Sequence, residues 1–236
     1  MKVAIMQPYL FPYIGYWQLI NAVNQFVILD DVNYIKQGFI NRNYILLNGQ
    51  SHMFSIPICQ ASQNRLIMDT KLNFSPKEKM KFIKTIEFAY KKAPYFLDVF
   101  PIIRDIIGND ESNLTKYILN SILKINKYLG IKTDICISSQ LKKDNCLKGE
   151  ERIKEICKCV GADIYINPSG GRMLYHSELF QEDNIKLFFL DPKMDQIRYY
   201  QNQENFESSL SIIDILMFNG KDEIKKMLGE YSLNAQ

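Results

Sequence analysis

The chain has 236 residues, of which 47% are hydrophobic, and a formal net charge of +3. This length and composition predict one large globular domain with a substantial core. No run of about 18 apolar residues is present, so we expect no membrane-inserted helix. The few apolar residues before Gln7 and Pro8 do not form a signal peptide, which predicts a cytoplasmic protein. The low net charge, with acidic and basic residues interspersed, argues against a nucleic-acid partner.

Clusters of lysines at residues 77–84, 91–92 and 142–143 are interpreted as solvated helix faces. The five cysteines are predicted to be free, because disulfides are rare in cytoplasmic proteins. Cys157 and Cys159 lie two residues apart on a predicted helix and therefore point to different sides. Since the two histidines are also isolated from each other, no metal site is predicted.

The first 22 residues predict a buried strand, a turn broken by two prolines, and a helix. A strand that ends in a polar turn and enters a helix is the usual start of a nucleotide- or sugar-binding α/β layer. The turn carries the candidate substrate-binding residues Gln7, Tyr13, Gly15 and Tyr16. The alternative is that the tyrosines only cover the edge of the sheet, since a buried tyrosine packs well with a single polar partner.

A second apolar run, at residues 26–29, ends in Asp30 and Asp31. The spacing fits a βαβ unit with parallel strands, so both acids would lie at the carboxyl edge of the sheet, where ligands bind. Both are candidate catalytic residues, as a general base for an amine or hydroxyl, a sugar-hydroxyl acceptor or a Mg²⁺ ligand. Adjacent residues point to opposite faces, and the sequence leaves open which acid faces the site. Turn initiation is the alternative role.

Residues 32–43 form a predicted polar loop that contains further candidate substrate-binding residues, namely Lys36, Asn41, Arg42 and Asn43. The guanidinium of Arg42 suits bidentate capture of a phosphate or carboxylate. In a strand, Arg42 would point away from the face shared by the two asparagines. An exposed strand edge is the alternative. The Asn48-Gly49 pair between two apolar runs then predicts a β-hairpin.

The middle of the chain, residues 75–130, is predicted to be a helical insert within a single domain of residues 1–236. Ser75 and Glu78 form a capping-box pattern with a proline between them, which starts a helix that extends to about residue 92. Pro94 and Pro101 are expected to divide the next segment into short helices. Apolar residues at helical spacing then predict a helix from residue 114 to 129, ended by Gly130.

An alternation of strands and helices returns in the second half. Strands are predicted at 134–137, 163–166 and 186–190, a helix at 149–160, a short helix from residue 177, and two helices in 205–231 with a break at 219–220. The simplest architecture is an α/β fold with a mostly parallel, Rossmann-like sheet assembled from both halves of the chain, together with the helical insert and the β-hairpin.

A glycine-rich turn follows the strand at 163–166 and could hold a diphosphate or carboxylate on its backbone N–H groups. It is neither a Walker A loop nor a dinucleotide fingerprint, and a tight turn without a ligand is the alternative. Its candidate substrate-binding residues are Asn167, Ser169, Gly170, Gly171, Arg172 and Tyr175. The neighbouring His176 is a candidate acid or base; a surface histidine near a helix start is the alternative.

These motifs resemble the WbqC-like protein family along nearly the whole chain. The resemblance rests on Gln7 to Tyr16, Asp30 to Tyr34, Asn41 to Asn43, Ile56-Pro57, Ala162 to Tyr165 and Gly170 to Tyr175. The family pattern has an acidic residue where this chain has His176, which weakens a catalytic role for that histidine.

The resemblance implies an enzyme of bacterial surface-polysaccharide biosynthesis, such as O-antigen and lipopolysaccharide sugars. The inferred reaction transfers an acyl or aminoacyl group to the amine of a nucleotide-linked amino-sugar, so the implied partners are that sugar and an acyl or aminoacyl donor. The sequence identifies no cofactor and leaves a homo-oligomer open.

The opening turn is also similar to that of the nucleotidyltransferase-like fold, in which Tyr13 and Tyr16 stand where histidines are expected. This likeness implies an alternative, an amide-forming ligase that uses ATP with Mg²⁺. A third alternative is a non-catalytic binding protein of a glycan pathway.

Overall fold

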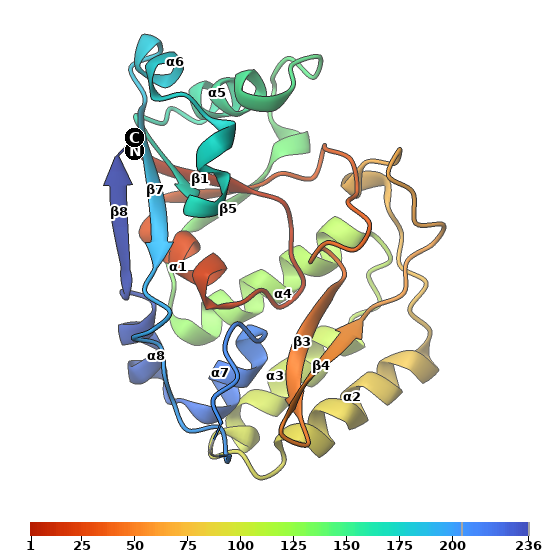
Figure 1. The fold of residues 1–236 in the computed structure, drawn as a ribbon. Coiled ribbons are helices and arrows are strands. Elements are labelled where there is room, and N and C mark those ends of the chain that lie inside the picture. The colour runs from red at the N-terminus through yellow and green to blue at the C-terminus, as the bar shows by residue number, and fades with distance from the viewer. Residues whose placement is uncertain (204, 236) are drawn as a thin grey trace.

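A six-stranded sheet forms the centre of the computed structural model, which describes residues 1–203 and 205–235 (Figure 1). The strand order is β5-β2-β1-β6-β7-β8. All neighbouring strands are parallel except the last pair, β7 and β8. The strands are β1 (Lys2–Met6), β2 (Gln25–Ile28), β5 (Asp134–Ile137), β6 (Ile164–Pro168), β7 (Lys186–Pro192) and β8 (Tyr231–Ala235). The predicted α/β fold, with a mostly parallel sheet built from both halves, is confirmed.

Helices cover both faces of this sheet, which explains why its inner strands are nearly continuous apolar runs. Ala4 and Phe26 point to the face shared with α1 (Ile14–Ala22) and α4 (Leu114–Leu129), in the larger core. Val3, Ile5 and Val27 point to the opposite face, where α5 (Gly149–Cys159) and α6 (Ser177–Glu182) pack.

The β-hairpin predicted around Asn48-Gly49 is confirmed and forms a separate two-stranded sheet of β3 (Arg42–Leu47) and β4 (Gln50–Ser55). Asn48 and Gly49 have φ angles of 52° and 75°. Positive φ at both central residues is the requirement of a type I′ turn, whose twist matches that of the flanking strands.

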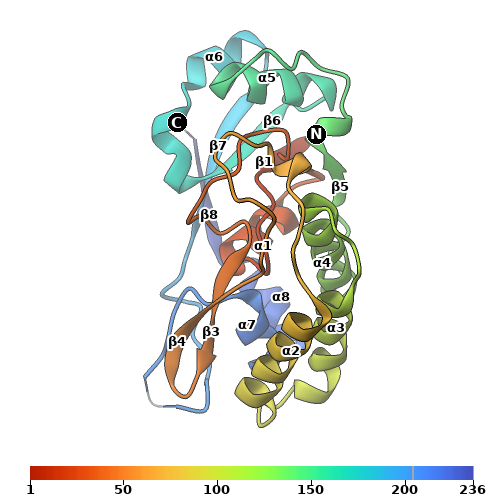
Figure 2. The ribbon, with the colours of Figure 1, turned by 90° about the vertical axis from the view of Figure 1, so that its right-hand side faces the viewer.

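Three helices follow the hairpin, beginning with α2 (Pro76–Tyr90) at the predicted capping box. The prediction that Pro101 divides the next segment is wrong, since α3 (Phe96–Gly108) is continuous through it, whereas Pro94 lies in the break between α2 and α3. Pro101, the sixth residue of α3, costs the helix one hydrogen bond. The packing of Val99, Ile103, Ile106 and Ile107 into the core outweighs that loss. Helix α4 ends as predicted at Gly130, which adopts the left-handed conformation with φ of 73°. In Figure 2, α2, α3 and the hairpin lie at one end of the molecule and α5 and α6 at the other.

The C-terminal part contains α7 (Ile212–Phe218) and α8 (Lys221–Met227), separated as predicted at Asn219-Gly220. The edge strand β8 was not predicted from the sequence. The buried Gln18 side chain holds the end of α8 in place, because its Nε2 donates to the carbonyls of Met227 and Glu230 at 2.7 and 2.9 Å. Within the described residues, no helix combines the length and the apolar character needed to cross a membrane.

Short 3₁₀ helices complete the fold. They are η1 (Ile67–Asp69), η2 (Ser138–Gln140) and η3 (Ser169–Leu174). The last two follow directly after β5 and β6, so they lie at the carboxyl edge of the sheet.

Candidate functional site

The parallel strands end at a common edge of the sheet, and the neighbouring strands β1 and β6 diverge there. Pairing between β1 and β2 continues to Met6 and Ile28, whereas pairing between β1 and β6 stops at Val3 and Tyr165. The chain leaves β1 toward α1 on one face of the sheet and enters β6 from α5 on the other. This reversal of strand order is the position at which open α/β sheets bind ligands.

The turn after β1 is a rigid wall of this edge. Phe11 is fully buried and has a φ of 44°, which is rare for a bulky residue. Asn43 Nδ2 donates to the carbonyls of Leu10 and Phe11 at 3.1 and 2.8 Å, and Ser211 Oγ donates to that of Phe11 at 2.8 Å. Such strain persists where the surroundings fix the backbone, and it concentrates at functional sites.

A small aromatic pocket of about 350 Å³ lies beside this turn. The ring centroid of Tyr9 is 5.6 Å from that of Tyr16 and 6.3 Å from that of Phe39. Within the described residues, no hydrogen bond is formed by the side chain of Tyr9, Tyr13 or Gln7. These polar groups are therefore available to a ligand. The pocket is lined by Tyr9, Pro12, Tyr13, Phe39, Asn43 and Ser209.

Gly15 and Tyr16 support the pocket from α1. A Cβ atom on Gly15 would lie 2.5 Å from the Tyr13 ring, so the glycine lets that ring pack onto the start of the helix. Tyr16 is buried, and its hydroxyl donates to the carbonyl of Gln7 at 2.9 Å. Desolvation raises the pKa of Tyr16, as does the neighbouring Tyr9. Tyr16 thus connects the end of β1 to the pocket.

The Asn41–Asn43 segment braces the site with its side chains. Asn41 Nδ2 donates to the Ile56 carbonyl at 2.8 Å, and the Tyr34 hydroxyl donates to Asn41 Oδ1 at 2.7 Å. Arg42 Nε donates to the Gly38 carbonyl at 3.0 Å. Among these three residues only Asn43 lines the pocket. Lys36 is exposed on the loop that they hold.

Asp30 lies at the end of β2 and is almost fully buried. Its Oδ1 accepts a hydrogen bond from the Ser139 N–H at 3.0 Å, and its Oδ2 accepts one from the Ser139 hydroxyl at 2.9 Å. Burial raises the pKa of Asp30, and the two hydrogen bonds from Ser139 only partly offset that effect. A carboxylate with a raised pKa is suited to accept a proton.

Asp31 points to different partners from those of Asp30. Its Oδ2 lies 2.6 Å from Lys143 Nζ, and the Lys143 side chain is completely buried. Arg152 Nη1 donates to the Asp31 carbonyl at 2.7 Å. Burial raises the pKa of Asp31, but Lys143, Ser138 and Arg152 outweigh it and hold the pKa below its ordinary value of 3.8. Asp31 therefore stays ionised and anchors the loop after β5.

The second wall follows β6. The Tyr165 hydroxyl donates to Asn167 Oδ1 at 2.9 Å. Gly171 packs against the Asn167 amide, so a side chain at this position would displace that amide. Gly170, in contrast, is exposed, with open space where a side chain would be.

Arg172 also belongs to this wall. Its Nη2 lies 3.0 Å from Asp191 Oδ2, and its guanidinium lies over the Phe189 ring, 5.1 Å from the centroid. The Ser169 hydroxyl lowers the pKa of Asp191 most, and Arg172 lowers it further. The wall thus contains an ion pair at the end of β7.

Tyr175 and His176 lie at the outer end of this wall. The Tyr175 hydroxyl lies 3.4 Å from that of Tyr165, whose proton is donated to Asn167. His176 Nδ1 is 3.1 Å from Glu150 Oε2, and the histidine side chain is 68% exposed. Glu150 therefore fixes the orientation of the imidazole from the start of α5.

Several residues of the site were not singled out by the sequence. Ser139 follows a predicted strand, which was the available signal. Lys143 was interpreted as part of a solvated lysine cluster, but it is buried against Asp31, a contact that no local pattern reveals. Tyr9 was not among the candidate residues of the turn, and Phe39 and Ser209 reach the pocket from distant loops. Within residues 1–203 and 205–235, no group of three metal-ligating side chains occurs.

Comparison with known proteins places the chain in a family. The chain is 28% identical over 228 residues to the uncharacterized protein Rv1507c of Mycobacterium tuberculosis, an alignment that covers 94% of this chain and 95% of the relative. No solved structure matches significantly. The sequence model of the WbqC-like protein family matches residues 7–226, which contain the whole carboxyl-edge site, and the chain belongs to that family.

Proposed function

We propose that the protein is an enzyme of surface-glycan sugar biosynthesis that acylates or aminoacylates the amine of a nucleotide-linked amino-sugar. The observation that carries this proposal is the aromatic pocket formed by the turn after β1, the start of the hairpin and the segment before α7. A ring-lined pocket with a few polar groups suits a flat base or a sugar ring. Its volume of about 350 Å³ is near the lower limit for ligand pockets, so it would hold one ring of the substrate and not the whole molecule.

The pocket residues would divide the recognition between stacking and hydrogen bonding. Tyr9, Tyr13 and Phe39 supply aromatic faces, while the two tyrosine hydroxyls supply polar contacts. Gln7, outside the pocket lining, would contribute its amide from the end of β1. Tyr16, Gly15 and Asn43 would act indirectly, by holding the turn and the Tyr13 ring in place.

The second wall would hold the anionic part of the substrate. Gly170 leaves its backbone open to approach, and Ser169, Arg172 and Tyr175 contribute polar groups around it. Arg172 already neutralises Asp191, so it would share its guanidinium between that carboxylate and a phosphate. Arg42, Lys36, Asn41 and Asn167 would contribute by shaping the loops.

Asp30 is the residue that we assign as the general base. In the proposed step, the substrate nitrogen attacks the carbonyl carbon of the donor, a C–N bond forms, and the bond to the leaving group breaks. The proton lost by the nitrogen passes to the Asp30 carboxylate, and the leaving group departs with the electron pair. Asp30 is favoured over Asp31 because its partners are the neutral donors of Ser139, whereas the Asp31 carboxylate is occupied by the Lys143 ammonium. Burial also raises the pKa of Asp30. His176 would be a second acid–base group, oriented by Glu150.

A thermal-shift titration tests the binding part of this proposal. A ligand at ten times its Kd stabilises the folded state by about 1.4 kcal/mol, which is a rise in Tm of about 3–6 °C for a chain of this size. We expect this rise with a dTDP- or UDP-linked amino-sugar, and a smaller one with the free nucleotide. The absence of any response to sugar nucleotides at millimolar concentration would refute the proposal.

An ATP-dependent, amide-forming ligase is a second candidate, favoured by the order of the parallel strands, β5-β2-β1-β6-β7. In this candidate, the turn would keep the nucleotidyltransferase-like shape with tyrosines where that fold has histidines. The hydroxyl of Tyr16 donates to the Gln7 carbonyl and so serves the shape of the turn. This candidate requires release of pyrophosphate or phosphate that depends on Mg²⁺ and an amino acid. An assay that detects no release of pyrophosphate or phosphate would exclude it.

A non-catalytic binding protein is the third candidate. It is supported if Asp30→Asn and Asp31→Asn both preserve glycan modification in folded protein.

A further inference from the structure

Helix α2 presents a lysine-rich face that the proposed function does not use. Lys77, Lys81 and Lys84 recur at spacings of four and three, so they lie along one side of the helix. Lys91 and Lys92 follow directly after its end. All five are exposed, and the first and last are separated by about 20 Å along the helix axis.

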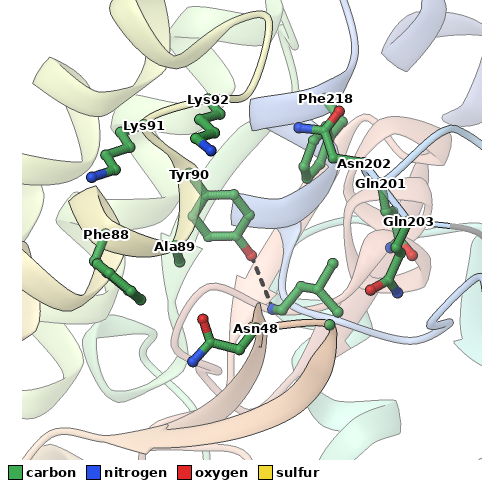
Figure 3. Close-up of a pocket in the computed structure, with 12 residues that line it drawn as sticks. Asn48, Phe88, Ala89, Tyr90, Lys91, Lys92, Gln201, Asn202, Gln203 and Phe218 are labelled. Atoms are coloured by element: carbon green, nitrogen blue, oxygen red, sulfur yellow. Dashed lines mark hydrogen bonds between the residues drawn. The ribbon is translucent and has the colours of Figure 1, made fainter.

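These lysines line two neighbouring hollows between α2 and the β3–β4 hairpin, which share Phe88 as a lining residue. One hollow is lined by Leu47 of the hairpin, by the three lysines on α2, and by Met80 and Phe88. Phe88 also lines the adjoining cavity of about 430 Å³, which contains Lys91, Lys92 and the hairpin tip (Figure 3). Met80 and Phe88 are 52% and 57% exposed, so two large apolar side chains lie in water among the lysines.

The lysines of this face outnumber the two acids of α2, Glu78 and Glu87. Lys79, on another side of α2, pairs with Asp110 at 2.9 Å. Within the part of the chain that the structure describes, no carboxylate pairs with Lys77, Lys81 or Lys84. Glu78, which lines the same hollow as these three lysines, is already engaged in the capping box with Ser75.

We propose that the α2 face, defined by Lys77, Lys81, Lys84, Lys91, Lys92, Met80 and Phe88, docks the protein on an anionic lipid bilayer. Lipid phosphates attract the lysines, and the interface accepts the two apolar side chains. A soluble polyanion would satisfy the lysines but would leave Met80 and Phe88 in water. Because α2 and the hairpin form one end of the molecule, such docking leaves α5 and α6 away from the bilayer (Figures 1 and 2).

Vesicle sedimentation with the full-length protein tests this inference. We expect binding to vesicles of phosphatidylglycerol and phosphatidylethanolamine, little binding to phosphatidylcholine, and weaker binding as salt is added. At about a fivefold effect for each lysine near the surface, Lys77→Gln, Lys81→Gln and Lys84→Gln together should weaken binding about 100-fold. The matched control, with Lys116→Gln, Lys127→Gln and Lys132→Gln, has the same net charge and should bind within about fivefold of the wild type.

The apolar contribution requires a second comparison. Phe88→Ser should weaken vesicle binding, whereas Leu123→Ser, at a residue that is 48% exposed on α4, should not. Circular dichroism confirms that each variant is folded. The proposal is overturned if the wild type does not bind anionic vesicles, or if both lysine triple variants weaken binding equally. It is also overturned if Phe88→Ser has no effect on vesicle binding while polyphosphate abolishes that binding. The last result would indicate a site for soluble polyanions.

Discussion

Lys143 Nζ lies 2.6 Å from Asp31 Oδ2, with both side chains buried at the carboxyl edge of the sheet. This ion pair joins the end of β2 to the loop after β5. The same Lys143 ammonium also donates to the Ser138 carbonyl at 2.7 Å. The pair therefore fixes the segment that also carries Ser139, the partner of Asp30.

Breaking this pair from one side should be costly. Lys143→Met leaves the Asp31 carboxylate buried without its cation, so we expect a loss of about 3–5 kcal/mol in the free energy of unfolding at pH 7. The double variant Lys143→Met/Asp31→Leu should recover much of that loss, because no charge is left unpaired. Urea denaturation measures both. Equal losses in the single and double variants would show that packing, and not charge, dominates.

The stability of the pair should also depend on pH. The pKa of Asp31 is held below 3.8 in the folded protein, so the folded state binds fewer protons at this site than the unfolded chain does. Its contribution is present above the unfolded pKa and is lost as the pH falls through the folded value. The destabilisation by Lys143→Met should therefore shrink in strongly acidic solution. Denaturation curves at pH 7 and at pH 3 test this sign, and a constant difference contradicts it.

In the proposed reaction, Asp30 should control the pH dependence. Because its pKa is raised from 3.8 by burial, the acidic limb of kcat/KM should lie above that value. Asp30→Asn should lower kcat by about 10²–10⁴-fold, the usual contribution of a general base, and should remove the limb. The pH–rate profile of the two proteins measures this. A limb that persists in Asp30→Asn would assign the base to another group.

The prediction from sequence succeeded where local patterns determine structure. The Asn48-Gly49 turn, the capping box at Ser75 and the Gly130 terminus all follow from the chemistry of neighbouring residues. The apolar runs also predicted the parallel sheet, since burial on both faces removes the alternation of polar and apolar residues.

Contacts between residues far apart in the sequence could not be predicted from such local patterns. Lys143 resembles any lysine in a polar stretch, and only the meeting of β2 and β5 buries it. Asn41 and Asn43 look like ligand-binding amides, yet their hydrogen bonds are made to Ile56, Leu10 and Phe11, far away in sequence. The edge strand β8 pairs with β7 from the end of the chain, a contact set by tertiary packing.

The turn after β1 should depend on Asn43. Asn43→Ala removes the donor to two carbonyls in a buried, strained segment, so we expect a loss of about 1–3 kcal/mol in stability. Ser211→Ala removes a donor to the same Phe11 carbonyl. Because the two side chains share a partner, their effects should not add. A double-mutant cycle by chemical denaturation measures this coupling, and strict additivity contradicts the shared role.

Gly15→Ala should damage binding more than folding. The new Cβ would lie 2.5 Å from the Tyr13 ring and would displace it from the pocket, while alanine itself favours a helix. Gly108→Ala is the matched control, since its Cβ would meet nothing within 4 Å. We expect at least tenfold weaker sugar-nucleotide binding in Gly15→Ala only, with the Tm of both variants near that of the wild type. Equal affinities of Gly15→Ala and the wild type for the sugar nucleotide would show that Tyr13 is not part of the binding surface.

The most direct test of the proposed function is a calorimetric titration of the wild type and of Tyr13→Ala with a dTDP- or UDP-linked amino-sugar. The aromatic pocket at the carboxyl edge predicts saturable binding to the wild type and a loss of about 1–3 kcal/mol, or roughly 5- to 150-fold in Kd, when the aromatic face is removed. An absence of binding at millimolar ligand, or equal affinity in the two proteins, would contradict it.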